Sequence, residues 1–134
     1  MNKAEALTLS RLAKAMCPQQ ASDDFTPDAW HMLLDDIRFE DAKDALVTHC
    51  KAHAFVAPAE IRAGVKRIRA QRLIDHEATH GPIEVPAGLE EGEYREFLRR
   101  IRKRIADGDV VEYPALPPSR PMPKLDGVFR AVEA

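Results

Sequence analysis

The sequence predicts an all-α protein: a compact four-helix N-terminal domain, a linker, one amphipathic basic helix and an extended proline-rich tail. Apolar residues recur at helical spacing through the first 80 residues, proline and acidic residues stand where helices begin, and prolines gather between residues 114 and 123. We therefore expect a helical domain over 1–78, a linker over 79–90, the amphipathic helix over 91–108 and the tail over 109–134.

The first helix is expected from Lys3 to Met16, with Asn2 as its N-cap and Pro18 closing it. Its apolar residues fall on one face: Leu9, Leu12, Ala13 and Met16. The second helix should begin at Thr26, whose hydroxyl can cap free N–H groups ahead of Pro27 and Asp28. The side chains expected to point inward from it are Trp30, Leu33, Leu34 and Ile37.

A break is expected before Phe39, where the third helix begins with acidic residues in its first turn. Its inward stripe is Ala42, Ala45, Leu46 and His49. Pro58 and Glu60 predict the start of a fourth helix, which should end near Asp75. This helix has two distinct faces. The apolar face consists of Ile61, Val65 and Ile68, with Arg72 at its far end. The other face is a basic stripe of Arg62, Lys66 and Arg69.

A linker rich in glycine and proline precedes the last predicted helix, in which acidic residues come first and six basic residues follow. Two interpretations of this helix remain open. It can lie in the groove of a partner protein, or its apolar side chains can fold back onto the first four helices. For the first case the predicted contact residues are Tyr94, Phe97, Leu98, Arg99, Ile101, Arg102 and Ile105.

The net charge of −2 argues against a polyanion-binding surface over the whole chain. Residues 58–80 are locally basic, however, so a small helical DNA-binding regulator that uses Arg62, Lys66 and Arg69 is the alternative function. Cys17 and Cys50 form no C-x-x-C pair, which favours reduced thiols in the cytoplasm. No apolar run approaches the roughly 18 residues of a membrane span, so we expect no membrane partner.

No pattern in the sequence predicts catalysis, a cofactor or a metal site. His49, Cys50 and His53 have the best metal-ligand spacing, but the glutamate of an H-E-x-x-H motif is missing and a fourth ligand would have to come from elsewhere. The six glycines form neither a P-loop nor a G-x-G-x-x-G motif, and the serines lack a nucleophile elbow. We therefore expect a protein that binds other molecules and is not an enzyme.

Three stretches between Lys3 and Leu73 resemble the family of phage and prophage replicative-helicase loaders and inhibitors. They are E-A-L-T-L-S-R-L-A-K-A, W-H-M-L-L-D-D-I-R-F-E-D-A-K-D-A-L-V-T-H and F-V-A-P-A-E-I-R-A-G-V-K-R-I-R. Most of the residues that carry the resemblance are core and helix-start positions: Trp30, Leu34, Ile37, Phe39, Ala42, Leu46, Pro58, Ile61 and Val65. The C-terminal half of the chain matches no motif of this family.

The resemblance implies an all-helical N-terminal domain and a C-terminal region that engages the hexameric replicative helicase without ATPase activity. Such proteins act in the bacterial cytoplasm, deliver the helicase to origin DNA together with an origin-binding initiator, and restrain its activity until loading. The resemblance supplies no catalytic residue. Since a shared fold does not fix a function, these expectations have to be weighed against the geometry of the molecule.

Overall fold

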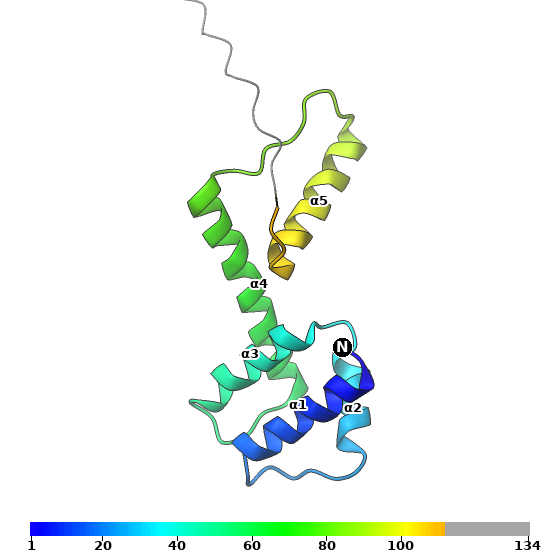
Figure 1. Ribbon diagram of the computed structural model, residues 1–134, viewed down its shortest axis with the longest axis vertical. Helices are drawn as coiled ribbons and strands as arrows, with labels where there is room; N and C mark the ends of the chain where they lie inside the picture. Colours follow the sequence, from blue (N-terminus) through cyan, green and yellow to red (C-terminus); the bar gives the residue numbers. More distant parts are fainter. Residues whose placement is uncertain (112–134) are drawn as a thin grey trace, which may run out of the picture.

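The computed structural model describes residues 1–111, and its regular structure is entirely helical within that range (Figure 1). The all-α fold class is therefore confirmed. From residue 112 on, the predicted proline-rich tail lies outside the described residues. The helices are α1 (Lys3–Met16), α2 (Thr26–Leu34), α3 (Phe39–Cys50), α4 (Pro58–His80) and α5 (Glu91–Asp107).

Local capping explains where the first helix begins. The Asn2 side chain accepts the Glu5 N–H at 2.9 Å, and the Glu5 carboxylate accepts the Asn2 N–H at 2.8 Å. This reciprocal pair satisfies two backbone donors that the first turn would otherwise leave free. The predicted bounds of α1 and its N-cap are thus confirmed.

The capping role predicted for Thr26 is wrong, because its hydroxyl faces Asp23 and makes no bond to the turns that follow. Asp23 Oδ1 accepts the backbone N–H groups of Phe25 and Thr26 at 3.0 and 2.9 Å, and the Thr26 hydroxyl at 2.9 Å. These bonds lower the pKa of Asp23, and the Thr26 hydroxyl contributes most. The start of α2 at Thr26 is correct, but the carboxylate that organises it lies three residues earlier.

The main core lies where α1, α2 and α3 meet the first turns of α4. Its most deeply buried large side chains include Leu9, Leu34, Leu46 and Ile61. The prediction that Leu33 points inward is wrong, since it is 55% exposed. Helix α2 packs only against α1 and α4 among the described helices, so its apolar residues cannot all find a neighbour.

Helices α3 and α4 approach closely because Gly64 faces Ala45. A Cβ atom placed on Gly64 would lie 2.8 Å from the Ala45 Cβ, which is closer than two carbon atoms can sit without a shift. Small residues on both helices therefore bring α4 against the core at this crossing. Farther along, α4 carries half-buried Ile68 against the same core.

The rest of α4 leaves the core and forms an arm with α5, which runs back along it (Figure 1). Helix α4 reaches His80 and does not end near Asp75 as predicted. Helix α5 packs against α4 and no other described helix, burying Ile101, Ile105 and Ala106. Gly108 ends α5 with a φ of 83°, a left-handed conformation that favours glycine at a helix C-terminus.

Candidate functional site

Helix α5 has two parts that differ in exposure. Ile101 and Ile105 are 8% and 4% exposed, because they pack against α4. Tyr94 is 45% exposed, and Phe97 and Leu98 are half-buried. The structure thus places the predicted contact residues in three groups, which are buried (Ile101 and Ile105), half-buried (Phe97 and Leu98) and exposed (Tyr94, Arg99 and Arg102).

Two polar contacts fix the C-terminal end of α5 to α4. Arg72 Nη1 on α4 donates to the Ala106 carbonyl at 2.9 Å, and Arg69 on α4 forms a hydrogen-bonded ion pair with Asp107. The earlier turns of α5 pair their charges locally, as Arg99 does with Glu96 at 2.9 Å. Such exposed pairs within one helix contribute only about 0.3 to 0.5 kcal/mol each. The sequence left two interpretations of this helix open, a partner's groove or folding back onto the earlier helices. The last turns of α5 do fold back, onto α4.

The free end of the arm displays apolar side chains, which we call the distal arm surface. Ile74 near the end of α4 is 59% exposed, and Leu89 in the linker is 37% exposed. The distal arm surface comprises Leu89 and three side chains of the early α5 turns, Tyr94, Phe97 and Leu98. Ile74 is not part of it, because helical spacing turns Ile74 away from Arg69 and Arg72, which contact α5. The sequence interpretation missed the exposure of Ile74 and Leu89. Helical spacing in the sequence already placed Ile74 away from the inward face of α4, and this spacing could have predicted its exposure.

The predicted basic stripe on α4 is largely neutralised by carboxylates. Arg62 Nη1 and Nη2 donate to both oxygens of Asp36 at 2.6 and 2.8 Å, and Nη1 also donates to the Leu33 carbonyl at 2.8 Å. The Arg62 guanidinium holds the pKa of Asp36 below its usual value. Arg69 is paired with Asp107, so Lys66 is the stripe residue with no ion pair among residues 1–111.

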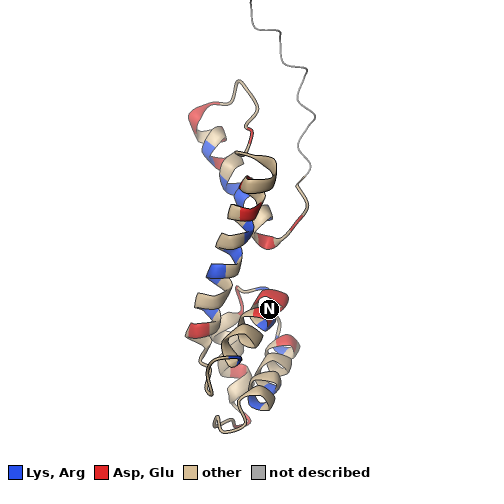
Figure 2. Cartoon of the chain, turned by 90° about the vertical axis from the view of Figure 1, so that its left-hand side faces the viewer, with Lys and Arg blue, Asp and Glu red and all other residues tan. Residues whose placement is uncertain are grey.

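Two further cations that the sequence interpretation missed lie beside Lys66. Arg38, ahead of α3, and Lys103, on α5, line the same surface hollow of about 660 Å³, and neither forms an ion pair within residues 1–111. The Lys and Arg residues follow one another along the arm in Figure 2. We call these three residues, Arg38, Lys66 and Lys103, the hollow cations. They come from three separate parts of the chain, so the periodicity of a single helix could not reveal that they lie together.

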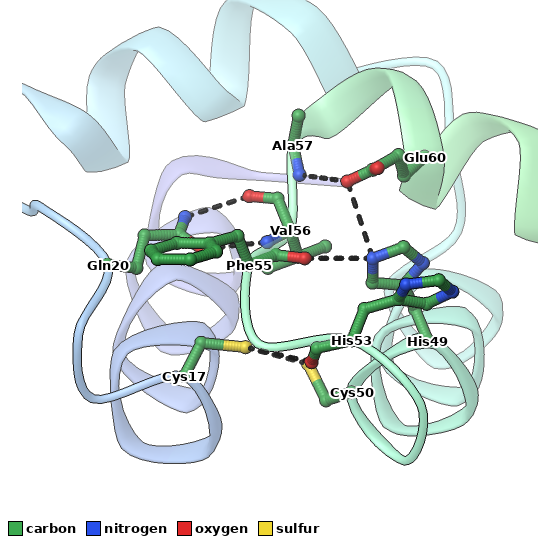
Figure 3. A network of polar contacts seen from close by, with 9 residues as sticks. All are labelled: Cys17, Gln20, His49, Cys50, His53, Phe55, Val56, Ala57 and Glu60. Carbon is green, nitrogen blue, oxygen red and sulfur yellow. Dashed lines mark hydrogen bonds and ion pairs between the residues drawn. The ribbon is translucent and has the colours of Figure 1, made fainter.

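A second polar cluster joins the end of α3 to the start of α4 (Figure 3). His49 Nε2 lies 2.9 Å from the Phe55 carbonyl and 3.4 Å from a Glu60 carboxylate oxygen, while the His49 and His53 rings stack at 4.4 Å. The Glu60 oxygen also accepts the Ala57 N–H at 2.6 Å. These contacts give His49 a role in holding the start of α4. Within residues 1–111, no three His, Cys, Asp or Glu side chains are grouped to hold a metal ion.

Comparison with protein-family models, with curated proteins and with solved structures finds no match for this chain. Among the described helices, none is both long and apolar enough to cross a membrane. The candidate sites therefore stand on their own geometry. They are the distal arm surface, which is apolar, and the hollow cations, which form a local positive surface.

Proposed function

We propose that this protein is a non-catalytic accessory protein of phage or prophage DNA replication that binds the hexameric replicative helicase. In this proposal it loads the helicase at the origin and restrains its activity until loading. The resemblance of residues 3–73 to helicase loaders and inhibitors supports the choice of partner. The proposed mechanism needs no catalytic residue and no cofactor.

The observation that carries the proposal is the distal arm surface. Tyr94 is 45% exposed at the free end of an arm whose other end is fixed by Ile101 and Ile105. An apolar surface on a projecting helix is suited to binding a groove on another protein, since binding removes that surface from water. Aromatic side chains such as Tyr94 are frequent anchors in such contacts.

In the proposed division of labour, residues 1–78 are the scaffold domain, which recruits other replication components such as an origin-binding initiator. Residues 79–90 are the linker, the helix over 91–108 contacts the helicase, and the tail over 109–134 extends that contact. Buried Ile101 and Ile105 serve to orient the contact helix. Exposed Arg102 is available to the partner, and Arg99 would exchange its bond to Glu96 for one to the partner. To restrain the helicase, the protein must bind one ring conformation more tightly than another.

Mixing the full chain with the replicative helicase of the host, followed by size-exclusion chromatography with light scattering, tests this proposal. A complex heavier than the helicase hexamer is expected at micromolar concentrations. Tyr94→Ala should weaken it, whereas Met32→Ala should not, although Met32 is 79% exposed on α2. Absence of a wild-type complex at these concentrations would rule out helicase binding as the function.

DNA binding is a second candidate function, favoured by the hollow cations. Arg62 and Arg69 are engaged by carboxylates, so Lys66 is the residue of the predicted stripe that is free to meet a phosphate. Affinity for an oligonucleotide should then fall steeply with salt and drop on Lys66→Glu. Lys51→Glu, at an exposed lysine after α3, is the matched control. Equal losses from both variants would indicate a non-specific charge effect.

A further inference from the structure

The two cysteines, 33 residues apart in the sequence, meet in space. Cys17 follows the last residue of α1 and Cys50 is the last residue of α3. Their sulfur atoms lie 3.2 Å apart and share a hydrogen bond as free thiols (Figure 3). A disulfide bond needs a separation of about 2.0 Å, so a small movement of either side chain is enough to form one.

Hydrogen bonds near both cysteines hold the two thiols at this distance. The Cys17 N–H donates to the Ala13 carbonyl at 2.8 Å, which fixes the end of α1. The Gln20 side chain then bridges to the loop that follows α3, donating to the Val56 carbonyl and accepting the Val56 N–H, both at 2.8 Å. Val56 is itself buried. The thiols are therefore held together by structure that does not depend on either sulfur.

A small reagent can reach the pair from one side. Both cysteines line a surface hollow of about 410 Å³ between the end of α1 and the loop after α3. Cys17 is 1% exposed, whereas Cys50 is only partly buried. The Cys50 sulfur is thus the one that a peroxide molecule in this hollow would meet first.

We propose that Cys17 and Cys50 are a redox modification site at which hydrogen peroxide forms an intramolecular disulfide. The Cys50 thiolate attacks one peroxide oxygen, the O–O bond breaks, and the departing hydroxide takes up a proton to become water. Cys17 sulfur then attacks the resulting Cys50 sulfenic acid, the S–O bond breaks, and a second water leaves with the Cys17 proton. Two thiols lose two electrons and hydrogen peroxide gains them. This proposal does not depend on helicase binding.

The environment of Cys50 sets the speed of the first step. Burial is the main cause that raises the pKa of Cys50 to about 11, and the hydrogen bond with the Cys17 thiol is the next. Because the thiolate is the attacking species, only a small fraction of Cys50 is reactive at pH 7. Disulfide formation should therefore be slow at neutral pH and accelerate about tenfold for each pH unit up to pH 9.

Intact-mass measurement after treatment of the full chain with peroxide tests the proposal. The expected product is a monomer that has lost two hydrogen atoms, with Cys17 and Cys50 joined in one cross-linked peptide pair after digestion. A disulfide-linked dimer, or a Cys50 sulfinic acid beside an unmodified Cys17, would overturn it. Unfolding of the oxidised and reduced wild type gives a second readout, since the cross-link should raise the urea midpoint.

Serine variants test the order of the two steps. In Cys17→Ser the resolving sulfur is gone, so Cys50 sulfenic acid should accumulate and be captured by dimedone. Cys50→Ser is the matched control, in which the buried Cys17 should label at least tenfold more slowly. Circular dichroism establishes that both variants are folded. Faster labelling of Cys17 than of Cys50 would overturn the assignment of Cys50 as the first residue to react.

Discussion

Replacing Arg72 by methionine removes a cation that joins three helices. Arg72 Nη2 donates to Asp41 Oδ1 on α3 at 2.6 Å, and Nη1 donates to the Ala106 carbonyl on α5 at 2.9 Å. The Asp41 side chain is 2% exposed, and its Oδ2 has no hydrogen-bond partner within residues 1–111. Arg72→Met therefore leaves a buried carboxylate without its counter-charge.

Removing one partner of a buried ion pair costs about 3 to 5 kcal/mol, because the remaining charge keeps its desolvation penalty. We expect the lower end of this range, about 3 kcal/mol, since 30% of the Arg72 side chain is open to water. The double variant Asp41→Leu/Arg72→Met removes both charges. It should recover to within about 1 kcal/mol of the wild type.

Urea unfolding followed by circular dichroism measures these free energies of unfolding. Arg67→Met is the matched control, because Arg67 is exposed on the same helix and forms no ion pair within residues 1–111. It should change stability by less than about 0.5 kcal/mol. A loss below about 1 kcal/mol for Arg72→Met, or a double variant less stable than the single one, would refute the reasoning.

Three further perturbations test the packing and the charges. Gly64→Ala should destabilise the fold by about 1 kcal/mol in thermal unfolding, since overpacking against Ala45 outweighs the gain in helix propensity. Gly92→Ala should instead stabilise the fold, because a Cβ atom there meets open space. Equal effects of the two would contradict this. Arg62→Ala should destabilise the fold slightly at pH 7, and the difference should shrink as the pH falls and Asp36 takes up a proton. Because Arg62 lowers the folded-state pKa of Asp36, this contribution is present above the unfolded pKa and is lost as the pH falls through the folded one. A difference between Arg62→Ala and the wild type that does not shrink on acidification would contradict this reasoning. Ile105→Ala should weaken the packing of α5 against α4 by about 2 to 5 kcal/mol. Limited proteolysis should then cleave α5 faster than α1. Cleavage of both helices at the same rate would contradict this.

The start of every helix could be predicted from the sequence because it depends on residues near one another, whereas the end of α4 at His80 was missed. The Asn2 and Glu5 pair at the start of α1 and the positive φ of Gly108 after α5 involve only a few adjacent positions. Pro58 likewise stands at the start of α4. Such local capping chemistry is visible in a sequence without knowledge of the fold.

The pairing of distant residues could not be predicted, since it follows from how helices cross. Arg62 looked like a free phosphate ligand, yet Asp36 lies 26 residues away in sequence and neutralises it. Cys17 and Cys50 carried no recognisable spacing and still share a hydrogen bond. Periodicity also overestimated the burial of Leu33, because it indicates a face of a helix but not whether another helix covers all of that face.

Hydrogen–deuterium exchange of the full chain, with and without the host replicative helicase, tests most directly whether the distal arm surface is the contact with the helicase. We predict that binding slows exchange over residues 89–100, which include Leu89 and Tyr94, while exchange over α1 and α3 is unchanged. Protection confined to α1–α3, or no protection anywhere at saturating helicase, would contradict the proposed mode of binding.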